Sequence, residues 1–424
     1  MAQSTIAMLI VLAAAVCFVT RIIPISITAV AASIAMAAFG IITWPVAFSG
    51  FANDVTVMVI GASIVGDAIF ETGAAKILGD WVLKLCGNSE RAFITACVII
   101  GCITSAFTSN LAVVVMMMPI AAAAASSSNG LITKKNTYMA IGFAAMIGGG
   151  MTLVGSIPNV VGQAFLVNAG LEPMAFFDLT LLTFPRFIVF VLFYATIGIS
   201  LQNKVFDFPE IPAPVMEAAE SGEEKPLSPI KVWTPVVIMV LMIAGFISGI
   251  WTPGALAMIA GIACVVTGSI SIHKVFEGMD WTTVWVLAGG LGFATGLSTS
   301  GAGELIATTV IGWFGGNLSF FKLLVVLYIV SVVLANLITA STVMTMLTPI
   351  ALFICKEMGY DGKAMVMALI MILNTSGFIN PVACAPVTVT LSGGYRFSDY
   401  AKMGSILTVV MGIATLVTFY FAYA

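Results

Sequence analysis

The sequence predicts an all-α polytopic membrane protein made of two inverted repeats, each with five membrane spans and one re-entrant hairpin. Three observations lead to this fold class: an apolar composition, a series of apolar stretches of spanning length, and motifs that recur in both halves. Of the 424 residues, 60% are hydrophobic and 8% are charged, and the mean hydropathy is +1.13. A soluble protein carries about 25% charged residues. The composition therefore excludes a soluble multidomain enzyme, a disordered protein, a nucleic-acid binder and a disulfide-stapled secreted scaffold.

Other residue totals exclude further classes of function. The formal net charge of −3 is too small to indicate a strongly charged partner. The seven cysteines are scattered through apolar stretches without metal-type spacing, and we interpret them as small core residues. His273 is the only histidine, which argues against a histidine-ligated transition metal, a His-dependent triad and a haem. We therefore expect neither an enzyme nor a bound cofactor.

Ten apolar stretches are expected to cross the bilayer, which requires about 20 apolar residues per helix. The first has no positive segment before it and is closely followed by Arg21, so we interpret it as a transmembrane helix rather than a signal peptide. The ten stretches are residues 4–20, 22–43, 55–72, 137–169, 179–201, 231–249, 253–271, 282–300, 363–392 and 402–423.

Two further regions, residues 91–127 and 320–357, each contain two apolar arms around a polar centre. Residues 108–110 form the first centre and residues 338–342 the second. Each arm is shorter than the about 20 residues that a span needs. We expect two re-entrant helical hairpins whose polar tips are held inside the protein, where irregular backbone can be satisfied.

The Pro- and Glu-rich segment 202–231 divides the chain into a first repeat, residues 1–201, and a second repeat, residues 232–424. Motifs on the two sides match at a nearly constant offset: Thr72-Gly73 with Ser300-Gly301, Met118-Pro119-Ile120 with Thr348-Pro349-Ile350, Pro158 with Pro386, and Phe176-Phe177-Asp178 with Phe397-Ser398-Asp399. An odd number of spans in each half turns the second copy upside down, as in secondary transporters.

The distribution of basic residues orients the chain. With the linker in the cytoplasm, Lys322, Lys356 and Lys363 lie outside and Arg186 lies within a span. The remaining Lys and Arg residues lie inside, as the positive-inside rule requires. We therefore expect a multi-pass protein of the inner (plasma) membrane. The inside residues are Arg21, Lys76, Lys84, Arg91, Lys134, Lys135, Lys204, Lys225, Lys231, Lys274, Arg396 and Lys402.

Glycine and proline interrupt the long helices 137–169 and 363–392, at residues 148–159 and 374–387. Proline removes a backbone donor and glycine weakens the helix, so both stretches should unwind. Freed carbonyl groups suit Na⁺, and N–H groups at helix N-termini suit an anion. A kink for packing is the structural alternative. Two tips and two interruptions lie in matching positions of the two halves, and each contains Ser, Thr or Asn. This symmetry favours a binding site for a cation and an anion over a kink for packing.

These motifs resemble a known family. Thr108-Ser109-Asn110-Leu111, followed by Pro119, resembles the Ser-Asn-Thr hairpin motif of the divalent anion/sodium symporter family. Gly155-Ser156-Ile157-Pro158-Asn159 is similar to its Gly-Thr-Pro-Pro-Asn loop, and Gly393–Tyr400 with Lys402 to its last-helix entry. The resemblance covers nearly the whole chain. Arsenite, citrate and sodium/proton transporters of the wider ion-transporter superfamily share the hairpin and broken-helix plan.

The resemblance implies an elevator-type homodimer that carries di- or tricarboxylates, often with sodium. Its partners would be a small anionic substrate, Na⁺, the lipid bilayer and a second copy of the chain, with no nucleic acid. The hairpins and broken helices would form a moving transport domain, and the other spans a fixed scaffold. Residues 73–88 and 302–316 would be the arm helices that connect the two domains.

The resemblance also implies the site residues. Ser109, Asn110, Gly155 and Asn159 would build the first cation site and one wall of the anion site, and the Ser156 hydroxyl adds a cation ligand. The second half would contribute Thr339, Ser341 and Pro386 to the substrate site, and Thr339 and Ala383 to the second cation site.

The chain departs from the family pattern mainly in the second half. Leu111 replaces a threonine at the first tip, Thr339-Ala340-Ser341 replaces the whole Ser-Asn-Thr motif, and Val387 stands where the loop has asparagine. Because two amides are lost, we expect the second cation site to be the weaker one.

Asp67 and Glu71 lie one helical turn apart in the third span. A carboxylate inside a span is costly and is a functional candidate, here a proton or sodium relay. In the structural alternative, Glu71 lies at the membrane edge with Lys76. Asp67 then caps or pairs at the interface between scaffold and transport domain. We favour this alternative because the counterparts in the second half, Thr295 and Thr299, are not acidic.

The sequence therefore predicts a secondary active transporter of a small organic anion, with a C4-dicarboxylate as the expected substrate and sodium symport or anion exchange as the mode. Two alternatives stay open. One is a sodium/proton antiporter that uses Asp67, and the other is a permease for an inorganic anion such as arsenite or sulfate.

Overall fold

The computed structural model describes residues 2–20, 22–73, 89–128, 130–209, 229–314 and 318–423, and every regular element in these residues is a helix. The first half contains α1 (Gln3–Thr20), α2 (Ile25–Ala38), α3 (Trp44–Phe48), η1 (Ser49–Ala52), α4 (Asp54–Glu71), α6 (Glu90–Ser105), α7 (Asn110–Ser127), α8 (Lys134–Gly149), α9 (Ile157–Asn168), α10 (Asp178–Phe193), the π-helical turn η2 (Tyr194–Gly198) and α11 (Ile199–Val205).

The second half contains α12 (Pro229–Ser248), α13 (Pro253–Val266), α14 (Ile272–Gly278), α15 (Trp281–Thr299), α16 (Ala302–Trp313), α17 (Phe320–Ala335), α18 (Ala340–Met358), α19 (Gly362–Ser376), η3 (Pro381–Ala383), α20 (Ala385–Val389), η4 (Thr390–Gly393) and α21 (Phe397–Tyr423). Five helices in the described residues are long and apolar enough to cross a membrane: Trp44–Glu71, Asp178–Val205, Lys231–Ser248, Ala340–Met358 and Phe397–Tyr423.

The helices break at the two predicted tips and in the two predicted interruptions. α6 and α7 are separated by residues 106–109, and α17 and α18 by residues 336–339. Serine caps the first arm of each hairpin: Ser89 Oγ accepts from Ala92 N, and Ser319 Oγ accepts from Lys322 N. A side-chain acceptor at this position satisfies one of the free N–H groups of the first turn.

Two predicted spans are shorter than expected. The stretch 22–43 forms a helix only to Ala38, and the stretch 253–271 only to Val266. Gly40 and Gly268 follow these ends with φ angles of 72° and 70°, a left-handed conformation that terminates helices. The predicted arm 302–316 is helical as α16, and most of the predicted arm 73–88 lies outside the described residues.

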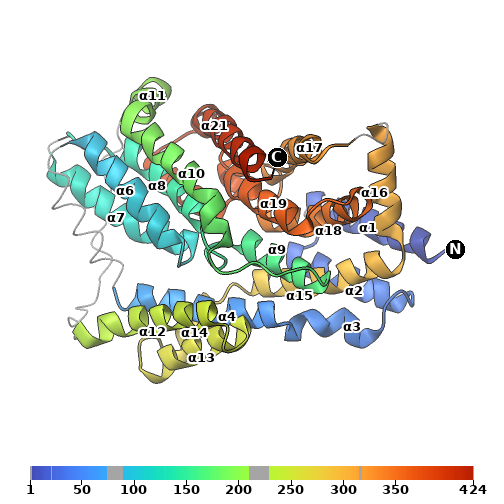
Figure 1. The fold of residues 1–424 in the computed structure, drawn as a ribbon. Coiled ribbons are helices and arrows are strands. Elements are labelled where there is room, and N and C mark those ends of the chain that lie inside the picture. The colour runs from blue at the N-terminus through green and yellow to red at the C-terminus, as the bar shows by residue number, and fades with distance from the viewer. Residues whose placement is uncertain are drawn as a thin grey trace.

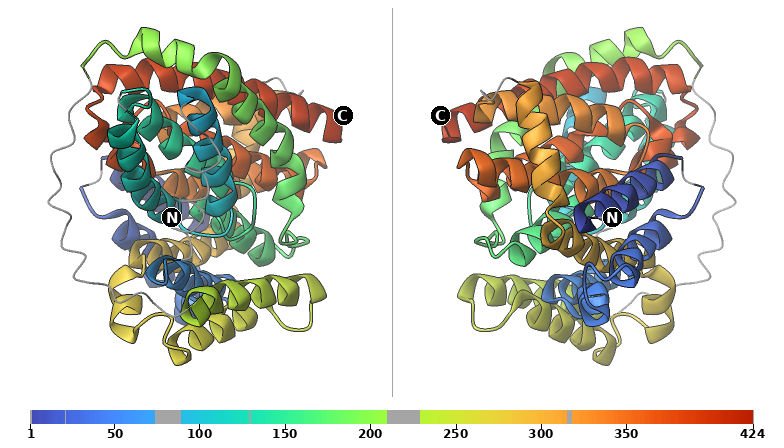
Figure 2. Two further views of the ribbon diagram at one scale, coloured as in Figure 1. Left: turned by 90° about the vertical axis from the view of Figure 1, so that its left-hand side faces the viewer. Right: turned by 90° about the vertical axis from the view of Figure 1, so that its right-hand side faces the viewer.

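The helices form two layers (Figure 1). One layer contains α2, α4 and α12 to α15, and the other contains α6 to α8, α10, α11, α17, α19 and α21. The views in Figure 2 show the same separation. α9 and α18 lie between the layers, where both contact α15.

Two helix pairs join the halves within the first layer: α4 packs along α13, and α15 packs along α2. A glycine permits each close approach. A Cβ atom on Gly61 would lie 2.5 Å from Met258 N, and one on Gly289 would lie 2.5 Å from the carbonyl carbon of Ala29. Small residues at such crossings let helix backbones touch.

We expect Gly61→Ala and Gly289→Ala each to lower the free energy of unfolding by about 1–3 kcal/mol, because the added methyl group would overlap the backbone of the facing helix. Thermal unfolding of the purified protein in detergent measures the effect. Gly312→Ala is the matched control, since nothing lies within 4 Å of a Cβ atom there. Equal unfolding temperatures for all three variants would contradict this account of the crossings.

Candidate functional site: two hairpin tips against two broken helices

Each hairpin tip lies against the interruption of a broken helix in its own half. In the first half, the Thr152 hydroxyl, in the gap between α8 and α9, donates to the Ala106 carbonyl at the tip. In the second half, Asn380 Nδ2, in the gap after α19, donates to the Asn336 carbonyl at 2.7 Å. The tips and the interruptions thus form one polar region in each half.

The first tip gathers oxygen atoms around the side-chain amide of Asn110. One terminal atom of this amide lies 2.6 Å from Ser105 Oγ, 3.0 Å from Gly155 O and 3.2 Å from Ala145 O. With nitrogen in this position the amide donates to the carbonyls. This orientation satisfies the amide without a cation, and turning the amide would bring Oδ1 to the same place, where four oxygens can surround a cation. We call these four residues the first oxygen cluster.

Further carbonyl groups surround Gly155. A Cβ atom on this residue would lie 2.6 Å from Gly149 O, 2.8 Å from Ala106 O and 3.0 Å from Ser105 O. Glycine is required here because three backbone oxygens occupy the space that a Cβ atom would need. Backbone carbonyl, amide and hydroxyl oxygens are the ligands that hard cations prefer. The chemistry of the first tip therefore fits Na⁺.

The ends of two helices meet at the same tip. α7 begins at Asn110 and α9 begins at Ile157, after the N-cap residues Ser109 and Ser156. Neither N-cap side chain accepts a hydrogen bond from its helix. Ser109 is exposed and Ser156 is half-buried. Helix N-termini carry partial positive charge and unpaired N–H groups, which favour an anion.

Asn159 occupies a different place from the other predicted residues. Its side chain is fully buried, and Nδ2 donates to Gly149 O at 2.7 Å and Thr152 O at 2.6 Å. Its Oδ1 accepts from Asn374 Nδ2 at 2.9 Å. Asn159 therefore braces the first interruption and links it to α19, and its side chain does not face the exposed part of the tip.

The second tip is rich in hydroxyl groups. Thr339 Oγ1 lies 3.2 Å from Ser341 Oγ and 2.8 Å from Thr342 Oγ1. Ala383 and Pro386 are both buried, and Ala383 N donates to Asn380 O. The hydroxyls of Thr339 and Ser341 thus face each other at the start of α18, while Ala383 lies in the facing interruption.

An amide pair that the sequence analysis missed connects the second tip to its interruption. Asn336 Nδ2 donates to Ser376 O at 2.7 Å, and Asn336 Oδ1 accepts from Asn380 N at 3.0 Å. Ser105, at the first tip, was also missed. A polar residue near the last turn of each hairpin's first arm is the sequence signal that could have identified both positions.

The acidic pair of α4 contacts α14. Glu71 forms an ion pair with Lys274, and Lys76, with which it was predicted to lie, is outside the described residues. A Cβ atom on Gly278 would lie 3.1 Å from Asp67 Oδ2. Asp67 Oδ2 therefore lies close to α14, and the neighbouring Gly66 approaches the first tip, where a Cβ atom would lie 3.8 Å from Thr108 Cα. His273 is exposed, 3.2 Å from Glu277.

The comparison with known families decides the class of protein. A family model described as "Citrate transporter" matches residues 15–319 and 253–424. The chain belongs to this citrate transporter family. This confirms the predicted resemblance to di- and tricarboxylate transporters of the ion-transporter superfamily.

Similar sequences are also transporters. An uncharacterized transporter of Haemophilus influenzae is 25% identical over 93% of this chain and 87% of its own length. An uncharacterized transporter of Synechocystis, sll0640, is 28% identical over 46% of this chain, and YfbS of Escherichia coli is 30% identical over 39%. The match spans only 32% and 27% of the length of these two relatives.

Two solved structures share the fold. The YdaH transporter of Alcanivorax borkumensis superposes with a TM-score of 0.63 at 15% identity, covering 89% of this chain and 87% of that one. MtrF of Neisseria gonorrhoeae, described among antimetabolite efflux pumps, gives a TM-score of 0.63 at 14% identity, over 88% and 81%. In the residues that the structure describes, this member of the citrate transporter family therefore has the all-helical fold of a membrane transporter.

Proposed function

We propose that the protein is a secondary active transporter of small organic anions of the di- or tricarboxylate class, by sodium symport or anion exchange. The observation that carries the proposal is the first oxygen cluster beside the N-termini of α7 and α9. It offers a cation site and an anion site within one tip. The family description supports a carboxylate as the anion.

The inverted repeat is supported by contacts that recur with the halves exchanged. Gly61 of α4 meets α13 of the second half, and Gly289 of α15 meets α2 of the first. In the first half, Thr152 donates to the carbonyl of Ala106. In the second half, Asn380 donates to the carbonyl of Asn336 in the same way. Such pairs are expected where two copies share one internal axis.

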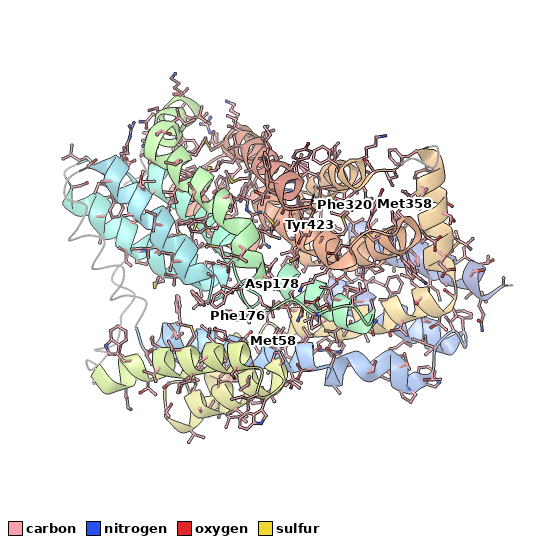
Figure 3. All side chains as sticks on the ribbon, viewed as in Figure 1. Met58, Phe176, Asp178, Phe320, Met358 and Tyr423 are labelled. Carbon is pink, nitrogen blue, oxygen red and sulfur yellow. The ribbon has the colours of Figure 1, made fainter. Side chains whose placement is uncertain are left out.

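The proposed mechanism is an elevator, in which α6 to α11 and α17 to α21, which include the hairpins and the helices of the same layer, move as one unit against α2, α4, α13 and α15. Phe176 marks the seam: its ring lies 6.4 Å from Phe107 at the first tip and 5.4 Å from Phe246 of α12. Figure 3 labels Phe176 next to Met58 of α4, at the junction of the two layers. We propose a homodimer in the plasma membrane as the working unit.

Uptake into proteoliposomes tests the substrate class. We expect labelled succinate or citrate to enter, with unlabelled di- and tricarboxylates as competitors and arsenite and sulfate without effect. An internal pH change driven by sodium alone would instead support an antiporter.

The orientation of the chain gives a second test. We expect Lys134 and Glu220 to face the cytoplasm and Glu172 and Ala424 to face outside; positions 220 and 424 lie outside the described residues. Two ion pairs support this arrangement, because each joins residues expected on one side: Lys363 with Glu172 at 2.8 Å, and Lys274 with Glu71.

Labelling of single cysteines with an impermeant reagent, in a variant without native cysteines, measures the orientation in intact cells. Positions 172 and 424 should react, while 134 and 220 should react only after permeabilisation. Labelling of position 220 from outside would reject the inverted-repeat arrangement.

A further inference from the structure

Arg186 is the one basic side chain that is completely buried in the described residues. It lies on α10 with 0% of its surface exposed, and its Nη1 donates to the Met371 carbonyl of α19. Its Nε and Nη2 have no hydrogen-bond partner among the described residues. Buried N–H groups of a charged side chain are almost always paired, so these two donors require an explanation.

The guanidinium lies where the first interruption begins. A Cβ atom on Gly150, the C-cap of α8, would be 2.9 Å from Arg186 Nη2 and 3.2 Å from Asn374 Cγ. Asn374 in turn donates to Asn159, which holds the interruption. Arg186 therefore sits beside the polar link between the two broken helices.

Among the residues that the structure describes, the charge of Arg186 has no counter-ion. The described residues show no ion pair to it, and the neighbouring ionisable group is the thiol of Cys102, which donates to Ala144 O at 3.2 Å. An arginine keeps its charge even when buried. A permanent positive charge inside a membrane protein is a functional candidate because it is costly to maintain.

At the second tip, side-chain amides donate to backbone carbonyls. Asn380 Nδ2 donates to Asn336 O, and Asn336 Nδ2 donates to Ser376 O, both at 2.7 Å. Amide donors and a cation compete for the same carbonyl oxygens. The two tips differ in their amides: Asn336 is held at both ends, because its Oδ1 also accepts from Asn380 N, whereas the Asn110 amide can turn its oxygen toward the first oxygen cluster.

We propose that Arg186 supplies the positive charge that a second coupling cation would otherwise bring. This inference rests on the proposed transport of carboxylates. A dianion, one sodium ion at the first oxygen cluster and Arg186 sum to zero charge, so the loaded unit crosses the membrane as a neutral body. The empty unit carries the single charge of Arg186.

The wild-type protein gives the first test, with a dicarboxylate in proteoliposomes. We expect one sodium ion to be taken up per anion, with a Hill coefficient for sodium near one. Exchange of internal for external dicarboxylate in equal sodium should change less than about 1.5-fold when a potential of 100 mV is imposed. Two or more sodium ions per anion, or strongly voltage-dependent exchange, would overturn the proposal.

The variants Arg186→Gln and Arg186→Lys give the second test. Exchange by Arg186→Gln should become voltage-dependent, changing more than about threefold over 100 mV, because one charge then moves with the loaded unit. Arg186→Lys should behave as wild type. A purely structural role for Arg186 would lower the rates of both variants without adding voltage dependence, and that result would overturn the proposal. If Arg186→Gln does not fold, the wild-type measurements decide alone.

The two proposals fail in different ways. Absence of uptake for every di- and tricarboxylate would reject the proposed function. Uptake with the wrong sodium stoichiometry would reject only the role of Arg186.

Discussion

Replacement of Asn110 by alanine should abolish measurable transport while leaving the protein folded. The amide is the only group at the first tip that can present either an oxygen to a cation or an N–H to the Gly155 and Ala145 carbonyls. Removing it leaves buried polar partners unpaired, which costs about 1–3 kcal/mol and about ten- to a hundredfold in affinity.

Uptake in proteoliposomes and gel filtration of the same preparation measure both parts of this prediction. Leu111→Ala is the matched control, because Leu111 is the next residue of α7 and its side chain is 38% exposed. It should retain uptake within about twofold, since an exposed side chain contributes little. Uptake at the wild-type rate by Asn110→Ala would show that the first tip has only a structural role.

The second large effect is expected from Gly149→Ala. A Cβ atom on Gly149 would lie 2.7 Å from Asn110 Nδ2 and 2.9 Å from Asn110 Cγ. The methyl group would displace the amide from Ser105 and Gly155, and misplacement of a positioning group by about 1 Å can cost a hundredfold in rate. We expect uptake to fall at least tenfold.

Thermal unfolding and sodium titration of uptake distinguish displacement of the amide from general damage. The variant should unfold near the wild-type temperature but need more sodium for half-maximal uptake. Gly312→Ala, with open space around its Cα, should change neither quantity. Unchanged sodium dependence in Gly149→Ala would contradict the assignment of the first oxygen cluster.

The positions of the tips and interruptions could be predicted from the sequence because local chemistry determines them. Short polar centres end the hairpin arms, and α7 and α18 begin at Asn110 and Ala340, within the predicted centres. Glycine ends α8 and proline precedes α20. Both residues act through their own backbone properties, which do not depend on the side chains around them. Glycine also ends α2 and α13 early. These ends were not predicted because Gly40 and Gly268 lie inside continuous apolar stretches.

The contacts made inside the site could not be predicted, because they join residues far apart in the chain. Asn159 matched a family motif, yet its partner Asn374 is 215 positions away and makes it a brace. Glu71 pairs with Lys274, which the folded chain brings to it from 203 positions away. Arg186 was recognised as an intramembrane charge, but its open donors follow only from the packing of α10 against neighbouring helices.

Gradient-driven accumulation by the purified protein tests whether it is a secondary active transporter of dicarboxylates. Proteoliposomes without internal sodium are given labelled dicarboxylate and an inward sodium gradient, and the internal concentration is followed over time. For a sodium symporter we expect accumulation above the external concentration that collapses when a sodium ionophore is added. For an exchanger we expect accumulation only in vesicles preloaded with unlabelled dicarboxylate. Internal label that never exceeds the external concentration under both conditions would contradict secondary active transport of dicarboxylates.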